Sequence, residues 1–152
     1  MKKAIYNSIT ETIGNTPLVR LKNIKKKFDL YGDIIAKLEF FNPLGSVKDR
    51  IGLAMIEESE KKGILQSGST IIEPTSGNTG ISLAAICASK GYKLILTMPE
   101  SMSNERRKML LLLGANIVLT PSKDGMLGAI KKAKELKLKF KNSIILQQFS
   151  NL

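Results

Sequence analysis

The chain has 152 residues, of which 43% are hydrophobic, so it has the size of one ordinary domain and enough apolar material for a core. Its 24 basic and 13 acidic residues give a net charge of +11, and it contains no histidine. The absence of histidine excludes a Ser-His-Asp triad, a Cys-His pair and a histidine-ligated zinc. Any proton transfer must therefore fall to Lys, Asp, Glu, Tyr or a cofactor. The single Cys87 excludes an internal disulfide and a multi-cysteine cluster, so no metal is expected.

The sequence predicts a cytoplasmic protein without a membrane partner. No apolar run approaches the roughly 20 residues that cross a bilayer, and the start MKKAIYNSITETIG lacks the apolar stretch of a signal peptide. The excess lysine lies mainly in residues 22–27 and 131–141, which lack the arginines and interleaved aromatics of nucleic-acid sites. We interpret both runs as solvated faces and expect no nucleic-acid partner.

Strand and helix patterns alternate along the chain. Strand-like segments are residues 31–40, 69–74, 92–99, 116–120 and 143–148. Helical patterns are residues 47–63, 78–91, 103–114 and 123–140, and the first three end on Gly63, Gly91 and Gly114, where a terminating glycine belongs. Consecutive apolar residues, as in Leu94–Leu96 and Ile117–Leu119, predict strands buried on both faces. The alternation predicts an α/β fold with a parallel sheet and crossover helices.

Three loops of unusual composition follow predicted strands. They are FNPLGSVK at 41–48, PTSGNTG at 74–80 and QQFSN at 147–151. In an open parallel sheet, ligands bind beyond the carboxyl ends of the strands, where such loops gather. We therefore expect the three loops to lie on one edge of one sheet and to converge on one ligand.

The middle loop has the composition of an anion cradle. Gly77 permits a tight turn, and Asn78 opens a buried helix whose unpaired amide groups face the loop. Hydroxyl groups add further donors, from Thr75, Ser76 and Thr79. These features predict a phosphate or carboxylate site, and the competing interpretation is simple helix capping, for which one such residue is enough.

Lys48 is the candidate reactive residue. Ser46 and Asp49 have the spacing of a capping box, which starts a helix near Val47 and places Lys48 in its first turn. The positive end of the helix dipole disfavours a cation there. A neutral lysine is a nucleophile that forms a Schiff base with an aldehyde cofactor and then acts as a base. The alternative is a lysine that extends into water beside an equally solvated Asp49 and Arg50.

Apolar neighbours also bear on Lys48. Phe40, Phe41 and Leu44 precede it closely, and we expect them to shield its amine from water. Such burial favours the neutral amine in the same direction as the dipole.

A resemblance to the cysteine synthases (O-acetylserine sulfhydrylases) runs along the chain. It is carried, in order, by TETIGNTPLVRL at 10–21, FNPLGSVKDRIGLAMI at 41–56, EPTSGNTGISLA at 73–84, TMPESMSNERRKMLLLLGANIVLT at 97–120 and LQQFSN at 146–151. These enzymes use pyridoxal phosphate and share fold type II with tryptophan synthase β and cystathionine β-synthase. The resemblance implies that the chain is the N-terminal part of such a two-domain enzyme.

The resemblance also implies roles for single residues. Lys48 would bind the aldehyde of pyridoxal phosphate as a Schiff base and later shuttle the substrate α-proton, and Asn78 would hydrogen-bond the cofactor's ring oxygen. Gly77 would let the backbone approach the substrate carboxylate, which would be held by Thr75, Ser76, Thr79 and Gln148. The implied reaction is β-replacement, in which O-acetyl-L-serine loses its α-proton and acetate and sulfide then adds to give L-cysteine. Such a cofactor explains acid-base chemistry in a chain without histidine.

The expected domains follow from the same resemblance. Residues 1–45 would pack on a larger domain of the enzyme, and residues 46–152 would form a smaller mobile one. The family's glycine-rich phosphate loop belongs to the other half, and residues 81–152 hold no second segment of that kind, so we expect impaired activity from the chain alone. The implied partners are O-acetylserine, sulfide, a second copy of the chain and serine acetyltransferase.

Other interpretations of the sequence stay open. One is a non-catalytic module that binds a partner such as serine acetyltransferase, and another is a generic anion-binding or nucleic-acid-binding α/β protein. A cystathionine β-synthase-like enzyme shares the same two motifs, but LQQFSN at 146–151 looks more like the sulfhydrylases.

Overall fold

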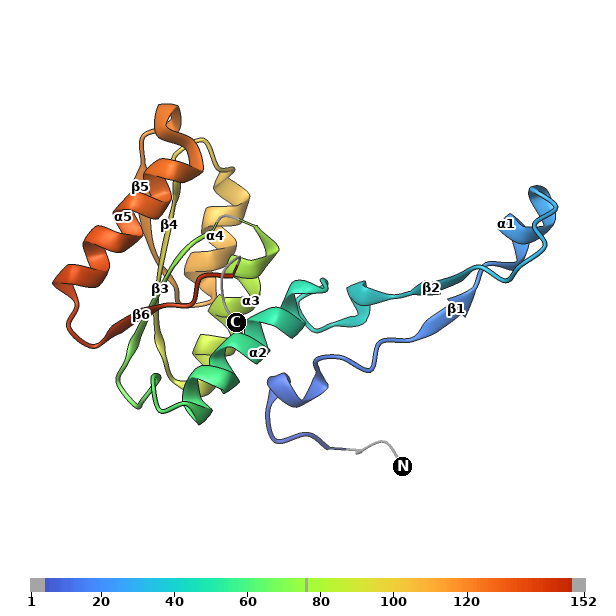
Figure 1. The fold of residues 1–152 in the computed structure, drawn as a ribbon, viewed down its shortest axis with the longest axis horizontal. Helices are drawn as coiled ribbons and strands as arrows, with labels where there is room; N and C mark the ends of the chain where they lie inside the picture. Colours follow the sequence, from blue (N-terminus) through green and yellow to red (C-terminus); the bar gives the residue numbers. More distant parts are fainter. Residues whose placement is uncertain (1–4, 76, 149–152) are drawn as a thin grey trace.

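The computed structural model describes residues 5–75 and 77–148. Figure 1 shows a compact α/β unit, which we call the sheet domain (residues 46–75 and 77–148), and a long projection, which we call the arm (residues 17–38). The chain before the arm forms a 3-10 helix, η1 (Ile9–Thr12), and touches the sheet domain, where Ser8 Oγ lies 2.9 Å from Ser89 Oγ.

The sheet domain is built on four parallel strands in the order β5-β4-β3-β6. Their bounds are β3 (Thr70–Pro74), β4 (Lys93–Pro99), β5 (Asn116–Thr120) and β6 (Ser143–Ile145). Ile72 in the central strand pairs with Ile95 on one side and with Ile145 on the other. This register places the carboxyl ends of β3 and β6 side by side on one edge of the sheet.

Helices cover both faces of this sheet (Figure 1). They are α2 (Lys48–Lys61), α3 (Asn78–Lys90), α4 (Asn104–Leu112) and α5 (Gly125–Lys139), with a short 3-10 helix, η3 (Ser122–Asp124), before the last. Successive strand residues point to opposite faces, so Ile71 packs in the larger core with Leu83 of α3, and Ile72 packs in the smaller core with Ala133 of α5. The predicted α/β fold with a parallel sheet is confirmed.

The predicted helices agree with the structure within a few residues. Gly63, Gly91 and Gly114 follow α2, α3 and α4 with positive φ angles of 68°, 78° and 86°, which only glycine adopts readily. The expectation that 117–119 is buried on both faces is wrong, because β5 is an edge strand and Leu119 is 42% exposed.

The arm is a separate two-stranded ribbon. Its strands β1 (Leu18–Arg20) and β2 (Ile35–Lys37) pair in antiparallel fashion, and α1 (Lys22–Lys27) lies between them at the tip (Figure 1). The prediction that residues 31–40 form a strand of the parallel sheet is therefore wrong. Apolar alternation indicates a strand without indicating its partner, and here the partner is the nearby β1, reached by a local hairpin.

Large apolar side chains are exposed along the whole arm, and none of residues 17–38 is buried. They are Leu18, Val19, Ile24, Phe28, Leu30, Tyr31, Ile34 and Ile35. An apolar surface of this extent is typical of a surface that another protein part covers.

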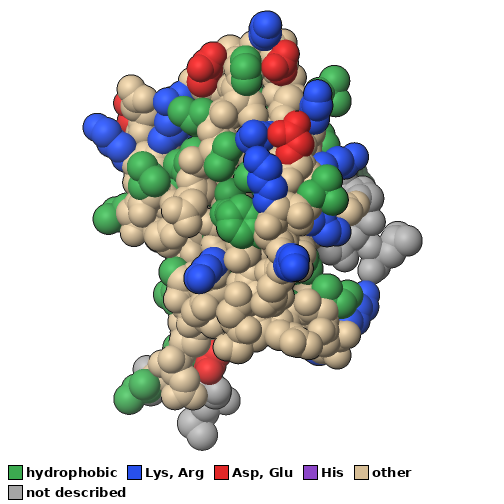
Figure 2. All heavy atoms as spheres, turned by 90° about the vertical axis from the view of Figure 1, so that its left-hand side faces the viewer, with side chains coloured by type: hydrophobic (Ala, Val, Ile, Leu, Met, Phe, Trp, Pro, Cys, Tyr) green, Lys and Arg blue, Asp and Glu red, His purple; other side chains and the backbone are tan. Residues whose placement is uncertain are grey.

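The lysine-rich surface is mixed in character. Figure 2 shows the face that α5 covers, on which basic side chains are spread among acidic and hydrophobic ones. Lys132 of this helix pairs with Glu135 at 3.3 Å. Within the described residues, no helix combines the length and apolar content that a membrane span requires.

Candidate functional site

Two of the three predicted loops meet at the carboxyl edge of the sheet. The segment after β3 leads into α3, and the segment after β6 contains Gln148. The hydroxyl of Thr79 donates a hydrogen bond of 2.7 Å to Gln148 Oε1. The structure thus brings together two residues that were predicted separately from distant parts of the sequence.

The segment between β3 and α3 is rich in hydroxyl groups. Thr75 and Thr79 are each only 3% exposed, whereas Asn78, the first residue of α3, is exposed. Gly77 occupies the N-cap position and offers no side chain to the first amide groups of the helix. A side chain at Gly80 would place its Cβ 3.2 Å from Thr75 Cγ2, so the close packing of helix on loop favours glycine there. Ser76, the remaining predicted residue of this loop, lies outside the described residues.

Lys48 is the first residue of α2, one position later than the helix start predicted near Val47. Ser46 Oγ accepts a hydrogen bond of 3.2 Å from the Lys48 backbone N–H. The predicted capping box does not form, because the Asp49 carboxylate accepts instead from the backbone N–H of Leu44, at 2.8 Å. Lys48 nevertheless occupies the first turn, as predicted.

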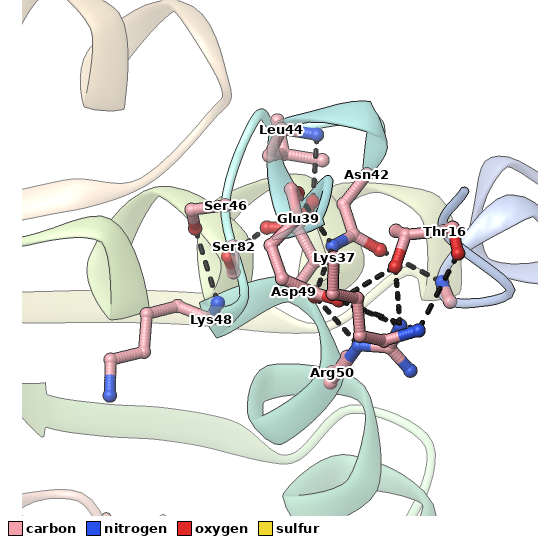
Figure 3. A network of polar contacts seen from close by, with 11 residues as sticks. Thr16, Lys37, Glu39, Asn42, Leu44, Ser46, Lys48, Asp49, Arg50 and Ser82 are labelled. Carbon is pink, nitrogen blue, oxygen red and sulfur yellow. Dashed lines mark hydrogen bonds and ion pairs between the residues drawn. The ribbon is translucent and has the colours of Figure 1, made fainter. Parts of the chain in front are cut away.

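The Lys48 side chain is half-buried and points away from the neighbouring polar network (Figure 3). Among the described residues, its ammonium group has no hydrogen-bond or ion-pair partner. The expected apolar cover is wrong in part, since Phe40 and Phe41 are 66% and 59% exposed. Their rings lie 5.0 Å apart, next to one another in the short 3-10 helix η2 (Glu39–Phe41), and they turn toward solvent.

Asp49 connects residues 41–48, which we call the Lys48 loop, to α3, the helix that follows the middle loop of residues 74–80. Its side chain is fully buried, and besides the Leu44 N–H it accepts a short hydrogen bond from the Ser82 hydroxyl (Figure 3). Ser82 lies four residues into α3 from Asn78, about one helical turn. The alternative of a solvated Asp49 is therefore wrong. Although FNPLGSVK follows a strand outside the parallel sheet, Asp49 still fastens it beside the helix that carries Asn78 and Thr79.

Arg50 anchors the two ends of the arm, at Thr16 and Glu39, which we call the root of the arm. Its guanidinium binds the Glu39 carboxylate through Nε at 2.8 Å and Nη2 at 3.1 Å, and Nη2 also donates to Thr16 Oγ1 at 3.1 Å (Figure 3). Asn42 completes the network by donating to Glu39 Oε2 at 2.9 Å and accepting from Gly14 N at 2.8 Å. Hydrogen bonding from Arg50 lowers the pKa of Glu39 from 4.5 to about 2, and the same pair raises the pKa of Arg50. The alternative of a solvated Arg50 is wrong too.

Glu73, in the central strand β3, fixes residues 146–148 at the start of the third loop, whose residues 149–151 lie outside the described residues. Its side chain is 1% exposed, and its carboxylate accepts from the backbone N–H groups of Leu146, Gln147 and Gln148 at 3.0, 3.1 and 3.2 Å. The prediction of a strand over residues 143–148 is wrong beyond Ile145. From Leu146 on, the backbone N–H groups bond to the Glu73 carboxylate and not to the backbone of β3. Burial raises the pKa of Glu73, and the three N–H donors act against that rise.

A surface hollow of about 630 Å³ lies next to these loops. It is lined by Arg50, Ile51, Ala54, Met55, Glu58, Lys62 and Gln148. Gln148 therefore borders both Thr79 and an open space along α2. Within the described residues, no group of three or more metal-ligating side chains of His, Cys, Asp or Glu gathers.

Sequence reasoning missed Glu73 and Ser82 and misplaced Asp49. A signal existed for Glu73, since a carboxylate in the apolar strand STIIEP requires buried partners. No comparable signal existed for Ser82, because small hydroxyl residues are common on buried helices.

This arrangement defines a class of protein: an α/β protein in which a donor-rich helix N-terminus and a glutamine meet at one sheet edge. The same helix is joined through Ser82 and Asp49 to the segment that carries a half-buried lysine, whose amine has no partner among the described residues. Such a site suits a ligand that has both a carbonyl group and an anionic group. A family comparison matches residues 9–152 to the pyridoxal-phosphate dependent enzymes. The chain belongs to this family.

Individual relatives agree with the predicted resemblance. A cysteine synthase of Staphylococcus aureus (strain Mu50 / ATCC 700699) is 59% identical over 137 residues, which is 90% of this chain and 44% of that protein. The crystal structure of a cysteine synthase from Entamoeba histolytica is 41% identical with a TM-score of 0.93, covering 99% of this chain and 46% of that one. A hydrogen sulfide-producing enzyme from Fusobacterium nucleatum is 45% identical with a TM-score of 0.90, covering 99% and 48%. The chain spans about half the length of these relatives.

Proposed function

We propose that the chain is the N-terminal part of a cysteine synthase, which converts O-acetyl-L-serine and sulfide to L-cysteine and acetate. The observation that carries the proposal is the arrangement around α3, where Ser82 hydrogen-bonds Asp49, the residue next to Lys48, and Thr79 hydrogen-bonds Gln148. The relatives that are named cysteine synthase support the choice of reaction.

The residues present fit the family's cofactor in part. The amine of Lys48 has no partner among the described residues and suits an aldehyde, and Asn78 offers an exposed amide at the N-terminus of α3. Pyridoxal phosphate, when bound, supplies an aldehyde and a ring that accepts electron density from the carbon that loses a proton. Lys48 is the residue we assign to hold this group and to move the α-proton, since its half-buried amine has no hydrogen-bond or ion-pair partner among the described residues.

The substrate carboxylate is assigned to the loop between β3 and α3. Gln148 Oε1 already accepts the Thr79 hydroxyl, so the NH₂ group of the same amide is left to donate to a carboxylate oxygen. Thr75 and Ser76 supply further hydroxyl groups, and Gly77 leaves the first amides of α3 accessible. These donors would hold the carboxylate of an amino acid at the N-terminus of α3.

We further propose that the exposed apolar arm packs on the larger domain of the complete enzyme, as the sequence predicts for residues 1–45. The side chains that would be covered are those of β1, α1 and β2. A second copy of the chain and serine acetyltransferase are the proposed protein partners, and the cytoplasm is the proposed compartment, consistent with the free, buried Cys87.

The proposal is tested with a chimera in which this chain replaces the matching half of the Staphylococcus aureus cysteine synthase. We expect sulfide-dependent formation of L-cysteine from O-acetyl-L-serine, and little from the 152-residue chain alone, which spans half of such an enzyme. Lys48→Arg keeps the positive charge but removes the nucleophilic amine, and we expect it to lower turnover by about a hundredfold to ten-thousandfold, as loss of a proton-transfer group does.

Lys108→Arg is the matched control, because Lys108 is exposed on α4 and has no role in the proposal. The proposal fails if the folded chimera forms no L-cysteine, or if Lys48→Arg and Lys108→Arg have equal turnover.

A further inference from the structure

Two acidic side chains are buried among the described residues, Asp49 and Glu73. Asp49 already has a role, because it fastens the loop that carries Lys48. Glu73 has different surroundings, since within the described residues no Lys or Arg pairs with it and its carboxylate accepts from three backbone N–H groups. A buried carboxylate without a cation is expensive unless several donors hold it, so this arrangement calls for an explanation.

The three donors come from consecutive residues. Leu146 and Gln147 donate to Oε2 of Glu73, and Gln148 donates to Oε1. Consecutive N–H groups can converge on one anion only where the backbone leaves the extended conformation, and Gln147 does so with φ 58°. The carboxylate therefore stops β6 at Ile145 and imposes the turn that follows.

The turn determines where Gln148 points. Directly after it, the Gln148 side chain meets Thr79 at 2.7 Å and borders the hollow along α2. Without the carboxylate, the N–H groups of residues 146–148 would lose the acceptor they share, and nothing would offset the unfavourable left-handed conformation of Gln147.

We propose that Glu73 is a positioning residue that holds the backbone of residues 146–148 as an anion nest, so that the Gln148 amide faces the carboxylate-binding loop. The identity of the bound carboxylate rests on the proposed function, but the positioning itself does not. Glu73 acts through the backbone and touches no ligand, which separates its role from those of Thr79 and Gln148.

The test uses ¹⁵N NMR of the 152-residue chain without cofactor, so its outcome is independent of the chimera assay. Glu73→Gln keeps the shape but presents an NH₂ group to N–H donors. We expect the amides of Gln147 and Gln148 to exchange about tenfold faster or more, the loss that one unpaired buried group causes. The Gln148 side-chain NH₂ resonances should move to the position of a solvated glutamine, while the amides of Ile71 and Leu96 keep their wild-type exchange.

A second pair of variants changes Gln147, the exposed residue of the turn that Glu73 holds. Gln147→Val disfavours the left-handed backbone, whereas Gln147→Gly accepts it without strain. We expect the valine variant to release Gln148 and the glycine variant to retain it, while Thr79→Val shifts the Gln148 side chain and leaves the amides of 146–148 protected. The proposal is overturned if Glu73→Gln leaves the Gln148 side chain unchanged, if exchange rises equally across the sheet, or if the two Gln147 variants behave alike.

Discussion

The sheet domain and the arm contain similar kinds of apolar residues but bury them very differently. Ile72 in β3 is fully buried between two strands and beneath α5, whereas Ile35 in β2 is 53% exposed with one neighbouring strand. The sheet domain holds its own core, whereas the described arm has backbone pairing, exposed ion pairs of Asp33 with Arg20 and Lys25, and the polar contacts at its root, but no buried residue. A two-stranded ribbon alone is marginal in water, so the arm is the part for which we propose a covering domain.

The largest expected effect is the difference in unfolding free energy between a substitution in the sheet domain and the same substitution in the arm. Ile72→Ala removes a fully buried side chain and should lower the free energy of unfolding by about 2–5 kcal/mol. Ile35→Ala makes the same change in another strand and should cost less than about 1 kcal/mol, the range of strand propensity alone. Urea denaturation of both variants measures the difference. Equal losses would show that the arm shares the cooperative core.

A smaller effect concerns Asp49, which fastens the Lys48 loop to the sheet domain. Asp49→Asn removes the negative charge and one of the two acceptor oxygens, so the bonds from the Leu44 N–H and the Ser82 hydroxyl cannot each keep a carboxylate oxygen, and it should cost about 1–3 kcal/mol of unfolding free energy. Asp29→Asn, at an exposed position of the arm, should stay within about 0.5 kcal/mol. Thermal and urea unfolding provide both values, and an Asp49 variant as stable as the Asp29 variant would contradict the assigned role.

The smallest effect concerns the root of the arm, where Glu39 meets Arg50. The pKa of Glu39 is lowered from 4.5 to about 2 in the folded chain, so its contribution to stability is present above pH 4.5 and is lost as the pH falls toward 2. An NMR titration should place the Glu39 midpoint near 2, and Arg50→Gln should return it toward 4.5. A wild-type midpoint near 4.5 would show that the root is not held by this pair.

The same contrast explains what could be predicted from the sequence. The alternation of β3, α3, β4, α4 and β5 is visible because each element contributes to one local core, and periodicity records burial. The arm was assigned to the wrong sheet because exposed apolar residues in a strand carry the same pattern as buried ones. Their partner is determined by tertiary context, which no single-chain pattern contains.

The candidate functional site, like the fold, could be predicted from the sequence only in part. Lys48, Thr79 and Gln148 were visible because loop composition and family resemblance mark them. Asp49 and Glu73 were not identified as anchors, since their roles depend on contacts with Ser82, 33 residues away, and with residues 146–148, 73 to 75 residues away. Such partners become evident only when the fold places them together.

The central claim is that Lys48 is the lysine that holds the cofactor. The direct measurement is to incubate the 152-residue chain with pyridoxal phosphate, reduce it with borohydride and map the labelled peptides by mass spectrometry. The structure predicts label concentrated on Lys48 and lost in Lys48→Arg, with Lys108→Arg unchanged. Label scattered over the exposed lysines of the arm and of α5, with Lys48 no more modified than they are, would contradict the account.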